Sequence, residues 1–149
     1  MTIYLKRVNA LRDRMKKDGT GAYFITKLAD IKWLSGFTGS TAYIMITPDS
    51  AVFVTDGRYE TQCREGLSDF WELVVIKSYA QWVKEAGEKF GTVTFQPDAP
   101  ISLSTYMPDV LVDTDDIMQY LRVVKDDDVL RALKEEYILA GSAFKACHL

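Results

Sequence analysis

Histidine and cysteine are scarce in this sequence. Its 149 residues include one histidine, His148, and two cysteines, Cys63 and Cys147. A metal centre needs several clustered ligands, and serine or cysteine catalysis needs a histidine base held by a third group. The sequence therefore predicts neither a metal site nor a catalytic triad in this chain. The cysteines stand apart from each other and from other ligands, which favours two reduced thiols.

Long apolar runs and a strong excess of one charge are also missing. No stretch approaches the roughly 20 apolar residues that span a bilayer, and the start MTIYLKRVNALRDRMKK predicts an amphipathic helix rather than a signal peptide. Lys and Arg number 18 against 21 Asp and Glu, a net charge of −3, and no segment is basic enough to gather many phosphates. We therefore expect a cytoplasmic protein with no nucleic-acid partner and no membrane partner.

The residues that are present indicate one α/β domain. Apolar residues recur every three or four positions from Tyr4 to Met15, which predicts a helix from Ile3 to Asp18 with Gly19 as its cap. The expected strands are residues 22–26, 43–47, 51–55, 73–76, 92–95 and 110–112, of which the second and third form a hairpin. The other expected helices are residues 58–65, 79–90 and 115–120. Because strands and helices alternate, we predict a mixed β-sheet flanked by helices.

The last segment differs from the rest. From Asp126 onward apolar residues keep helical spacing up to Cys147, and three aspartates at 126–128 suit the positive end of a helix dipole. No glycine or proline ends this pattern before Leu149. We therefore expect residues 1–125 to form the domain and residues 126–149 to begin a linker helix toward a further domain that is missing here.

Two segments carry residues suited to binding. In Asp30–Ser40, DIKWLSGFTGS, a short apolar turn is followed by glycine and hydroxyl residues just before a strand. The backbone of such a loop can come close to a binding partner. In Thr55–Tyr59, TDGRY, the second hairpin strand gives way to a helix. Asp56 has a simpler interpretation as the helix N-cap, with Arg58 exposed and Tyr59 packed.

These segments, together with Leu121–Val129, LRVVKDDDV, resemble three motifs of the N-terminal domain shared by creatinase, prolidase and the Xaa-Pro aminopeptidases. The family motifs are Asn-Ile-x-Tyr-Leu-Thr-Gly-Phe, Thr-Asp-x-Arg-Tyr and Leu-Arg-x-x-Lys-Ser-x-x-Glu-Ile. The chain departs from them at Asp30, Trp33, Ser35 and Asp128-Val129, and each departure keeps the size or the chemistry of the usual residue.

The resemblance implies a ribonuclease-H-like creatinase/prolidase N-terminal fold with no catalytic residue. In the family, two Asp, one His and two Glu of a second, pita-bread domain hold two divalent metal ions, manganese or cobalt, that activate a water to attack the peptide bond before proline. Those ligands have no match here. The chain would then be inactive alone, help to form a homodimer, adjoin its own catalytic domain and narrow the access of peptides with proline at the second position.

The resemblance also implies which residues face the neighbouring active site. They are Phe37, Thr38, Ser40, Thr41, Asp56, Arg58 and Tyr59. Arg58 is the candidate for binding a substrate carbonyl or carboxylate. Family dipeptidases tend to carry a longer, charged insertion after the Gly-Phe turn, whereas here four uncharged residues, 38–41, precede the strand. This favours an Xaa-Pro aminopeptidase over the alternatives, an Xaa-Pro dipeptidase (prolidase) and a non-catalytic interaction module.

Overall fold

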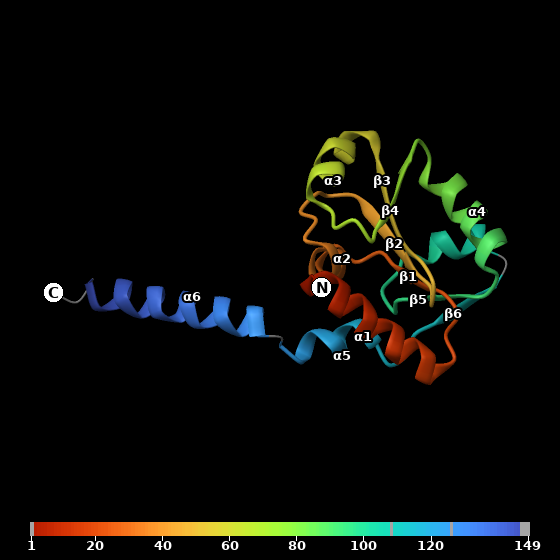
Figure 1. Ribbon diagram of the computed structural model, residues 1–149. Helices are drawn as coiled ribbons and strands as arrows, with labels where there is room; N and C mark the ends of the chain where they lie inside the picture. Colours follow the sequence, from red (N-terminus) through yellow and green to blue (C-terminus); the bar gives the residue numbers. More distant parts are fainter. Residues whose placement is uncertain (1, 108, 126, 147–149) are drawn as a thin grey trace. The chain divides into compact units, whose positions relative to one another are not determined.

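The computed structural model describes residues 2–107, 109–125 and 127–146, which belong to two compact units, Met1–Met118 and Gln119–Leu149. The first unit is a six-stranded mixed sheet between two layers of helices (Figure 1). Its strands are β1 (Tyr23–Ile25), β2 (Ala42–Ile46), β3 (Ala51–Asp56), β4 (Glu72–Ile76), β5 (Val93–Phe95) and β6 (Val110–Val112). Its helices are α1 (Ile3–Asp18), α2 (Leu28–Ser35), α3 (Glu60–Gly66), α4 (Tyr79–Phe90), the start of α5 (Ile117–Val123) and the 3₁₀ helices η1 (Gly57–Tyr59) and η2 (Ile101–Tyr106).

The sheet has the order β4-β3-β2-β1-β5-β6. The pairs β1–β2 and β2–β3 are antiparallel. The pairs β3–β4, β1–β5 and β5–β6 are parallel. In the β2–β3 hairpin Ala42 is opposite Thr55 and Ile46 is opposite Ala51. The predicted mixed sheet is confirmed.

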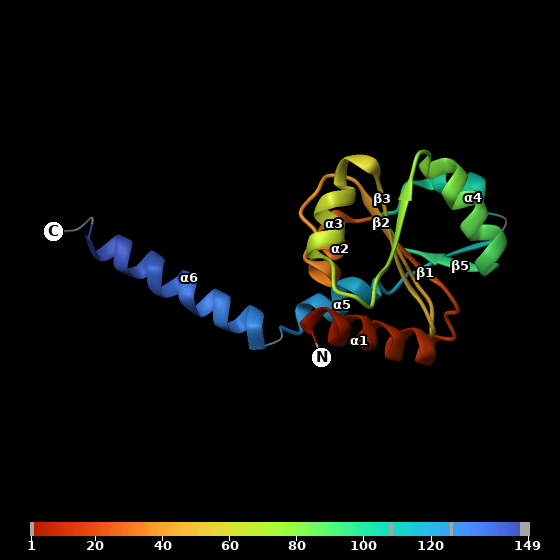
Figure 2. The same ribbon diagram turned by 45° about the horizontal axis from the view of Figure 1, so that its top comes forward.

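Alternating side chains divide the core between the two faces of the sheet, as the pleat of a strand requires. Phe24 packs with Phe95 and with Trp82 of α4 on one face. On the other face Phe53 packs with Phe37 and Trp71. Figure 2 shows the same division, with α4 on one side of the sheet and α1, α2 and α3 on the other.

Helix α1 has the predicted bounds, Ile3–Asp18. Thr2 caps it by accepting a hydrogen bond from the Leu5 N–H at 3.3 Å, and Gly19 ends it at φ 70°, a conformation that glycine adopts without strain. Its apolar stripe contributes Val8, Leu11 and Met15 to the core. Local signals alone define this helix.

Two elements have no counterpart in the sequence prediction, and α5 begins and ends later than the helix predicted at residues 115–120. Residues 28–35 form helix α2, where only a short apolar turn was expected within Asp30–Ser40, and residues 101–106, for which nothing was predicted, form η2. Helix α2 spans only two turns and begins after Lys27, whose side chain makes no capping hydrogen bond. Burial of Ile31 and Leu34 stabilises it instead, so tertiary packing replaces the missing local signal.

Buried polar groups join the strand ends to the helices. The Tyr23 hydroxyl donates to Asp113 at 2.6 Å, and Asp113 accepts the Ile117 N–H at the start of α5 at 2.7 Å. Burial raises the pKa of Tyr23, and the hydrogen bond to Asp113 adds to this effect. The buried Gln96 amide donates to Asp30 of α2 at 2.6 Å. Asp30, which replaces the family's asparagine, therefore still serves as a hydrogen-bond acceptor.

The second unit contains the end of α5 and helix α6 (Asp127–Ala146). The expected long helix is therefore present, while Asp126, Cys147 and His148 lie outside the described residues. Within the ranges that the structure describes, none of the helices has both the length and the apolarity needed to cross a bilayer.

Candidate functional site

The seven residues singled out from the sequence meet at one end of the sheet. This end holds the C-terminal residues of the parallel strands β3 and β4, where Asp56 is in register with Ile76. The helix after β3, α3, packs on one face of the sheet, and the helix after β4, α4, on the other (Figures 1 and 2). Such a point of divergence, at the carboxyl ends of parallel strands, is where α/β folds generally bind ligands.

The Gly36-Phe37 turn is held from both sides. Gly36 ends α2 at φ 78°, and an added Cβ would lie 2.4 Å from the Tyr4 hydroxyl of α1. The Ser35 hydroxyl donates to the Ile31 carbonyl at 2.7 Å and accepts the Phe37 N–H at 3.2 Å. Phe37 is buried. The turn is therefore an anchored part of the core and fixes where the following loop begins.

Side chains of η1 and α3 bind the loop of residues 38–41. Gln62 donates to the Thr38 hydroxyl at 3.1 Å, and the Tyr59 hydroxyl accepts the Ser40 N–H at 3.2 Å and lies 2.7 Å from the Ser40 hydroxyl. These contacts join the two sequence segments into one surface, which we call the loop cluster. It comprises residues 37–41 and 56–59.

Asp56 and Arg58 form a close pair inside the loop cluster. Asp56 accepts the Arg58 N–H at 3.0 Å, and the Arg58 guanidinium donates to its two oxygens at 2.9 and 2.8 Å. Hydrogen bonding from Arg58 lowers the pKa of Asp56, and Asp56 in turn raises the pKa of Arg58. The interpretation of Asp56 as the N-cap is therefore confirmed. Arg58 is 67% exposed and also donates to the Thr41 hydroxyl at 3.3 Å.

Tyr59 connects the core to the loop. Its ring packs edge-on against Phe37 with centroids 5.4 Å apart, and the Arg58 guanidinium lies 5.5 Å from the ring centroid. A Cβ on Gly39 would fall 2.2 Å from the Phe37 ring and 2.8 Å from the Tyr59 ring, so only glycine fits between them. Hydrogen bonding with Ser40 lowers the pKa of Tyr59.

Sequence reasoning missed two contributors to this site. Gln62 holds Thr38, and the Tyr79 hydroxyl at the start of α4 donates to the Thr41 carbonyl at 3.4 Å. Burial raises the pKa of Tyr79 to about 12, so it stays protonated at neutral pH. The parallel pairing of β3 with β4 places Tyr79 here, and no local sequence signal predicts that pairing.

Below the Gly36-Phe37 turn lies a small hollow of about 50 Å³ that Cys63 helps to line. Cys63 is a free thiol, 2% exposed, and its burial raises its pKa to about 11. An apolar environment of this kind makes a thiol unreactive. The predicted reduced state therefore holds for Cys63, whereas Cys147 lies outside the described residues.

We predict that Cys63 reacts with a thiol reagent only when the chain unfolds. In a Cys147→Ser variant at pH 8, labelling by an aromatic disulfide should be at least about 100-fold slower in buffer than in urea. Because the folded-state pKa is raised, unfolding should become easier as the pH rises from about 8.5 toward 11, by at most about 1.4 kcal/mol per pH unit. Fast labelling of the folded chain would contradict this burial.

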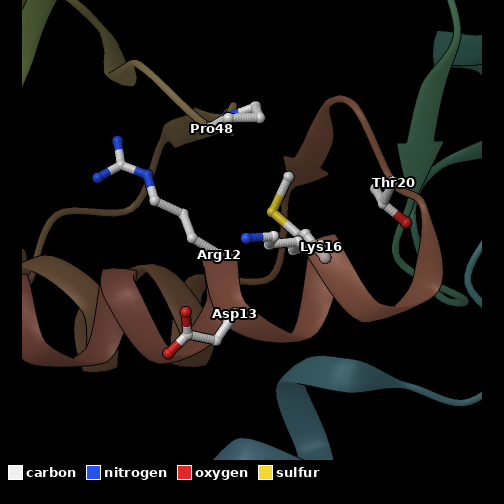
Figure 3. A pocket seen from close by; sticks show the side chains of 6 residues that line it. Arg12, Asp13, Lys16, Thr20 and Pro48 are labelled. Carbon is white, nitrogen blue, oxygen red and sulfur yellow. The ribbon is translucent and has the colours of Figure 1, made fainter.

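A larger hollow of about 410 Å³ lies between α1 and the turn after β2. It is lined by Arg12, Asp13, Met15, Lys16, Thr20 and Pro48. Figure 3 shows the Arg12 guanidinium and the Asp13 carboxylate pointing in different directions. Arg12 is also engaged elsewhere, since it donates to the Thr47 carbonyl at 2.9 Å. The polar groups of this hollow do not converge on one ligand position.

The residues present do not fit a two-metal centre. Within the described ranges, no group of three or more His, Cys, Asp or Glu side chains is placed to hold a metal ion. Carboxylate and imidazole clusters are what two-metal hydrolases require. The loop cluster instead combines a cation paired with one carboxylate, several hydroxyls and two aromatic rings.

The sequence model of the Creatinase/Prolidase N-terminal domain family matches residues 7–124. This chain belongs to that family. The match covers both halves of the loop cluster and stops before α6. The fold and the family predicted from three short motifs are therefore confirmed.

Two curated relatives illustrate the setting of the domain. The chain is 27% identical to the peptidase YqhT of Bacillus subtilis over 93% of its own length and 42% of that protein. It is 33% identical to Xaa-Pro aminopeptidase 2 of Rattus norvegicus over 61% of its own length and 15% of that protein. The chain thus spans less than half of either relative. Its relatives are Xaa-Pro peptidases and related peptidases.

Solved structures with the same fold come from several such proteins. An Xaa-Pro dipeptidase from Bacillus anthracis has a TM-score of 0.83 at 21% identity, over 96% of this chain and 42% of that one. A creatinase/prolidase-like N-terminal domain from Corynebacterium diphtheriae has a TM-score of 0.64 at 31% identity, over 74% and 94%. The X-prolyl aminopeptidase of Caenorhabditis elegans, a cytosolic enzyme with a di-nuclear active site, has a TM-score of 0.63 at 22% identity, over 80% and 25%.

Proposed function

We propose that this chain is the non-catalytic N-terminal domain of a cytoplasmic Xaa-Pro aminopeptidase, a proline-specific metallopeptidase. In this proposal residues 1–125 form the domain, and residues 126–149 begin the linker helix to a catalytic domain that holds two manganese or cobalt ions. The domain helps to form the homodimer and restricts access to the active site. One observation carries the proposal: all seven candidate residues gather in the loop cluster, at the carboxyl ends of β3 and β4.

Arg58 is the residue of the loop cluster best suited to meet a peptide. Its Nε and Nη2 donate to Asp56 and Thr41, while Nη1 makes no hydrogen bond to any described residue. The pairing with Asp56 orients the guanidinium without burying it, and its exposed part can donate to a carbonyl or carboxylate. The pairing with Asp56 and Thr41 uses Nε and Nη2, so Nη1 is the guanidinium nitrogen available to a ligand.

The short loop supports the aminopeptidase over the dipeptidase. Residues 38–41 carry no charge, and Gln62 and Tyr59 hold them against α3 and η1. Such a loop supplies no cation of its own for the free carboxylate of a dipeptide and leaves room for a longer chain. The second candidate is an Xaa-Pro dipeptidase, with which the fold is equally compatible, since the Bacillus anthracis dipeptidase shares it. A non-catalytic interaction module of the same fold is the third.

Kinetics on matched substrates separates these candidates. We expect the 149-residue chain, supplied with Mn²⁺ or Co²⁺, to leave an Ala-Pro-Ala tripeptide intact. The reading frame that contains it should continue with the two Asp, one His and two Glu of the metal site, and its full product should cleave the tripeptide faster than the dipeptide Ala-Pro. A preference for the dipeptide would support the prolidase, and a full product without the ligand set would support the interaction module.

A further inference from the structure

Strand β6 forms an open edge of the sheet, beside β5 and far in strand order from the loop cluster at β3 and β4 (Figure 1). The Asp109 carbonyl and the Asp113 N–H bond to β5, at 3.0 and 2.9 Å. Alternate residues of a strand point the same way, so the backbone groups of Val110 and Val112 point outward. In the part of the chain that the structure describes, these groups have no hydrogen-bond partner. A strand added beside β6 could therefore form backbone hydrogen bonds with Val110 and Val112.

A hollow of about 500 Å³ lies against this edge. Phe95 and Met107 are buried side chains of its wall, while Val110 and Val112 form its rim. The lining is completed by Gln96, Pro97, Ala99 and Ser104. Its volume is in the range of ligand pockets, and its lining is mostly apolar. An edge with open backbone groups and an adjoining apolar hollow is the arrangement that binds extended peptides.

Exposed apolar side chains mark the same strand. Val112 is 59% exposed and Leu111, on the opposite face, is 55% exposed. Sheet edges are usually protected by short strands, by lysine or by a bulge, and β6 is short but carries no lysine. Its shortness, three residues, limits any contact to a few hydrogen bonds.

Acidic side chains near the β6 edge indicate what kind of segment could bind there. Between Lys89 and Arg122 the chain has five aspartates, residues 98, 109, 113, 115 and 116, and no lysine, arginine or histidine. Asp98 pairs with Lys27 at 2.9 Å and Asp115 lies 3.8 Å from Arg14, yet their side chains remain 52% and 76% exposed. Asp113 is buried and accepts a hydrogen bond from Tyr23, so the exposed acidic side chains near the edge are Asp98, Asp109 and Asp115. Two copies paired at this edge would bring these like charges near one another, which disfavours a second copy of this chain.

We propose that β6 and its hollow form a docking site for an extended, apolar segment of another polypeptide that is flanked by lysine or arginine. The segment adds a strand to the sheet through Val110 and Val112, and alternate side chains enter the hollow. Its basic ends meet the aspartates around the edge. This site lies apart from the loop cluster, and its function does not depend on peptidase activity.

Titration of the 149-residue chain with a blocked KVTVTK peptide, followed by amide NMR shifts, tests the site. We expect shifts centred on β6 and β5 and a Kd of about 10–500 µM, because three residues bury little surface. A KVTVTK peptide N-methylated at its valines and an EVTVTE peptide should each bind at least about tenfold more weakly. Equal binding of either control, or shifts centred elsewhere, would overturn the proposal.

Two matched variants locate the contact. Val112→Lys places a cation on the rim and should weaken KVTVTK binding at least about tenfold. Leu111→Lys adds the same charge on the other face of the strand and should change the Kd by less than about threefold. Equal effects would mean that charge alone, not the edge, drives binding. Dimerisation of the chain, abolished by Val112→Lys in sedimentation, would assign the edge to a second copy and also overturn the proposal.

Discussion

Replacing Phe37 by alanine should lower the free energy of unfolding by about 3–5 kcal/mol, the usual cost of truncating a buried phenylalanine. Phe37 is 5% exposed and packs edge-on against Phe53 at 5.2 Å and Tyr59 at 5.4 Å. The variant loses this burial and leaves a cavity between the core and the loop cluster. Equilibrium urea unfolding of the 149-residue chain measures the change.

Two controls separate packing from simple loss of an aromatic ring. Phe37→Leu keeps most of the apolar volume and should cost less than about 1.5 kcal/mol. Tyr106→Ala removes a ring that is 43% exposed and should cost much less than Phe37→Ala. A loss below about 1 kcal/mol for Phe37→Ala would show that this ring is not part of the core.

Gly36→Ala should cost about 2–4 kcal/mol in the same assay. At φ 78° a residue with a Cβ pays about 1–2 kcal/mol in backbone strain alone. The added Cβ would also lie 2.4 Å from the Tyr4 hydroxyl oxygen and 2.9 Å from Cζ of the same ring, so the Tyr4 ring must move away from the turn. The loop cluster begins at the next residue, Phe37.

Gly66→Ala is the matched control, because a Cβ there meets nothing within 4 Å and its φ is not positive. It should change the free energy of unfolding by less than about 1 kcal/mol. Tyr4→Phe combined with Gly36→Ala removes the nearest clashing atom and should recover part of the loss. If Gly36→Ala were as mild as Gly66→Ala, the close approach of Tyr4 to Gly36 would be wrong.

The elements with strong local signals were predictable from the sequence. Helix α1 has an apolar stripe and ends at Gly19, a residue that adopts a positive φ without strain. The hairpin of β2 and β3 has two runs of strand-forming residues on either side of Pro48-Asp49-Ser50. Helix α2 was not predictable, because it is short, lacks a side-chain cap and depends on the burial of Ile31 and Leu34.

The membership of the candidate site was predictable, but its geometry was not. The motifs identified Phe37 and Arg58, and the structure adds that Tyr59 packs between the core and Ser40. Tyr79 was missed because it lies 38 residues from Thr41 in the sequence and reaches it only through the parallel pairing of β3 and β4. Non-local strand pairing leaves no periodic signal around either residue.

In the proposed function, the loop cluster serves the active site of a longer peptidase through Arg58. Steady-state kinetics of the full-length product on Ala-Pro-Ala tests it most directly, comparing Arg58→Ala with Lys84→Ala, which removes an exposed cation of α4. We expect kcat/KM to fall at least about tenfold for Arg58→Ala and less than about twofold for Lys84→Ala, with both melting temperatures unchanged. An Arg58→Ala enzyme with unchanged kcat/KM and unchanged melting temperature would contradict the account.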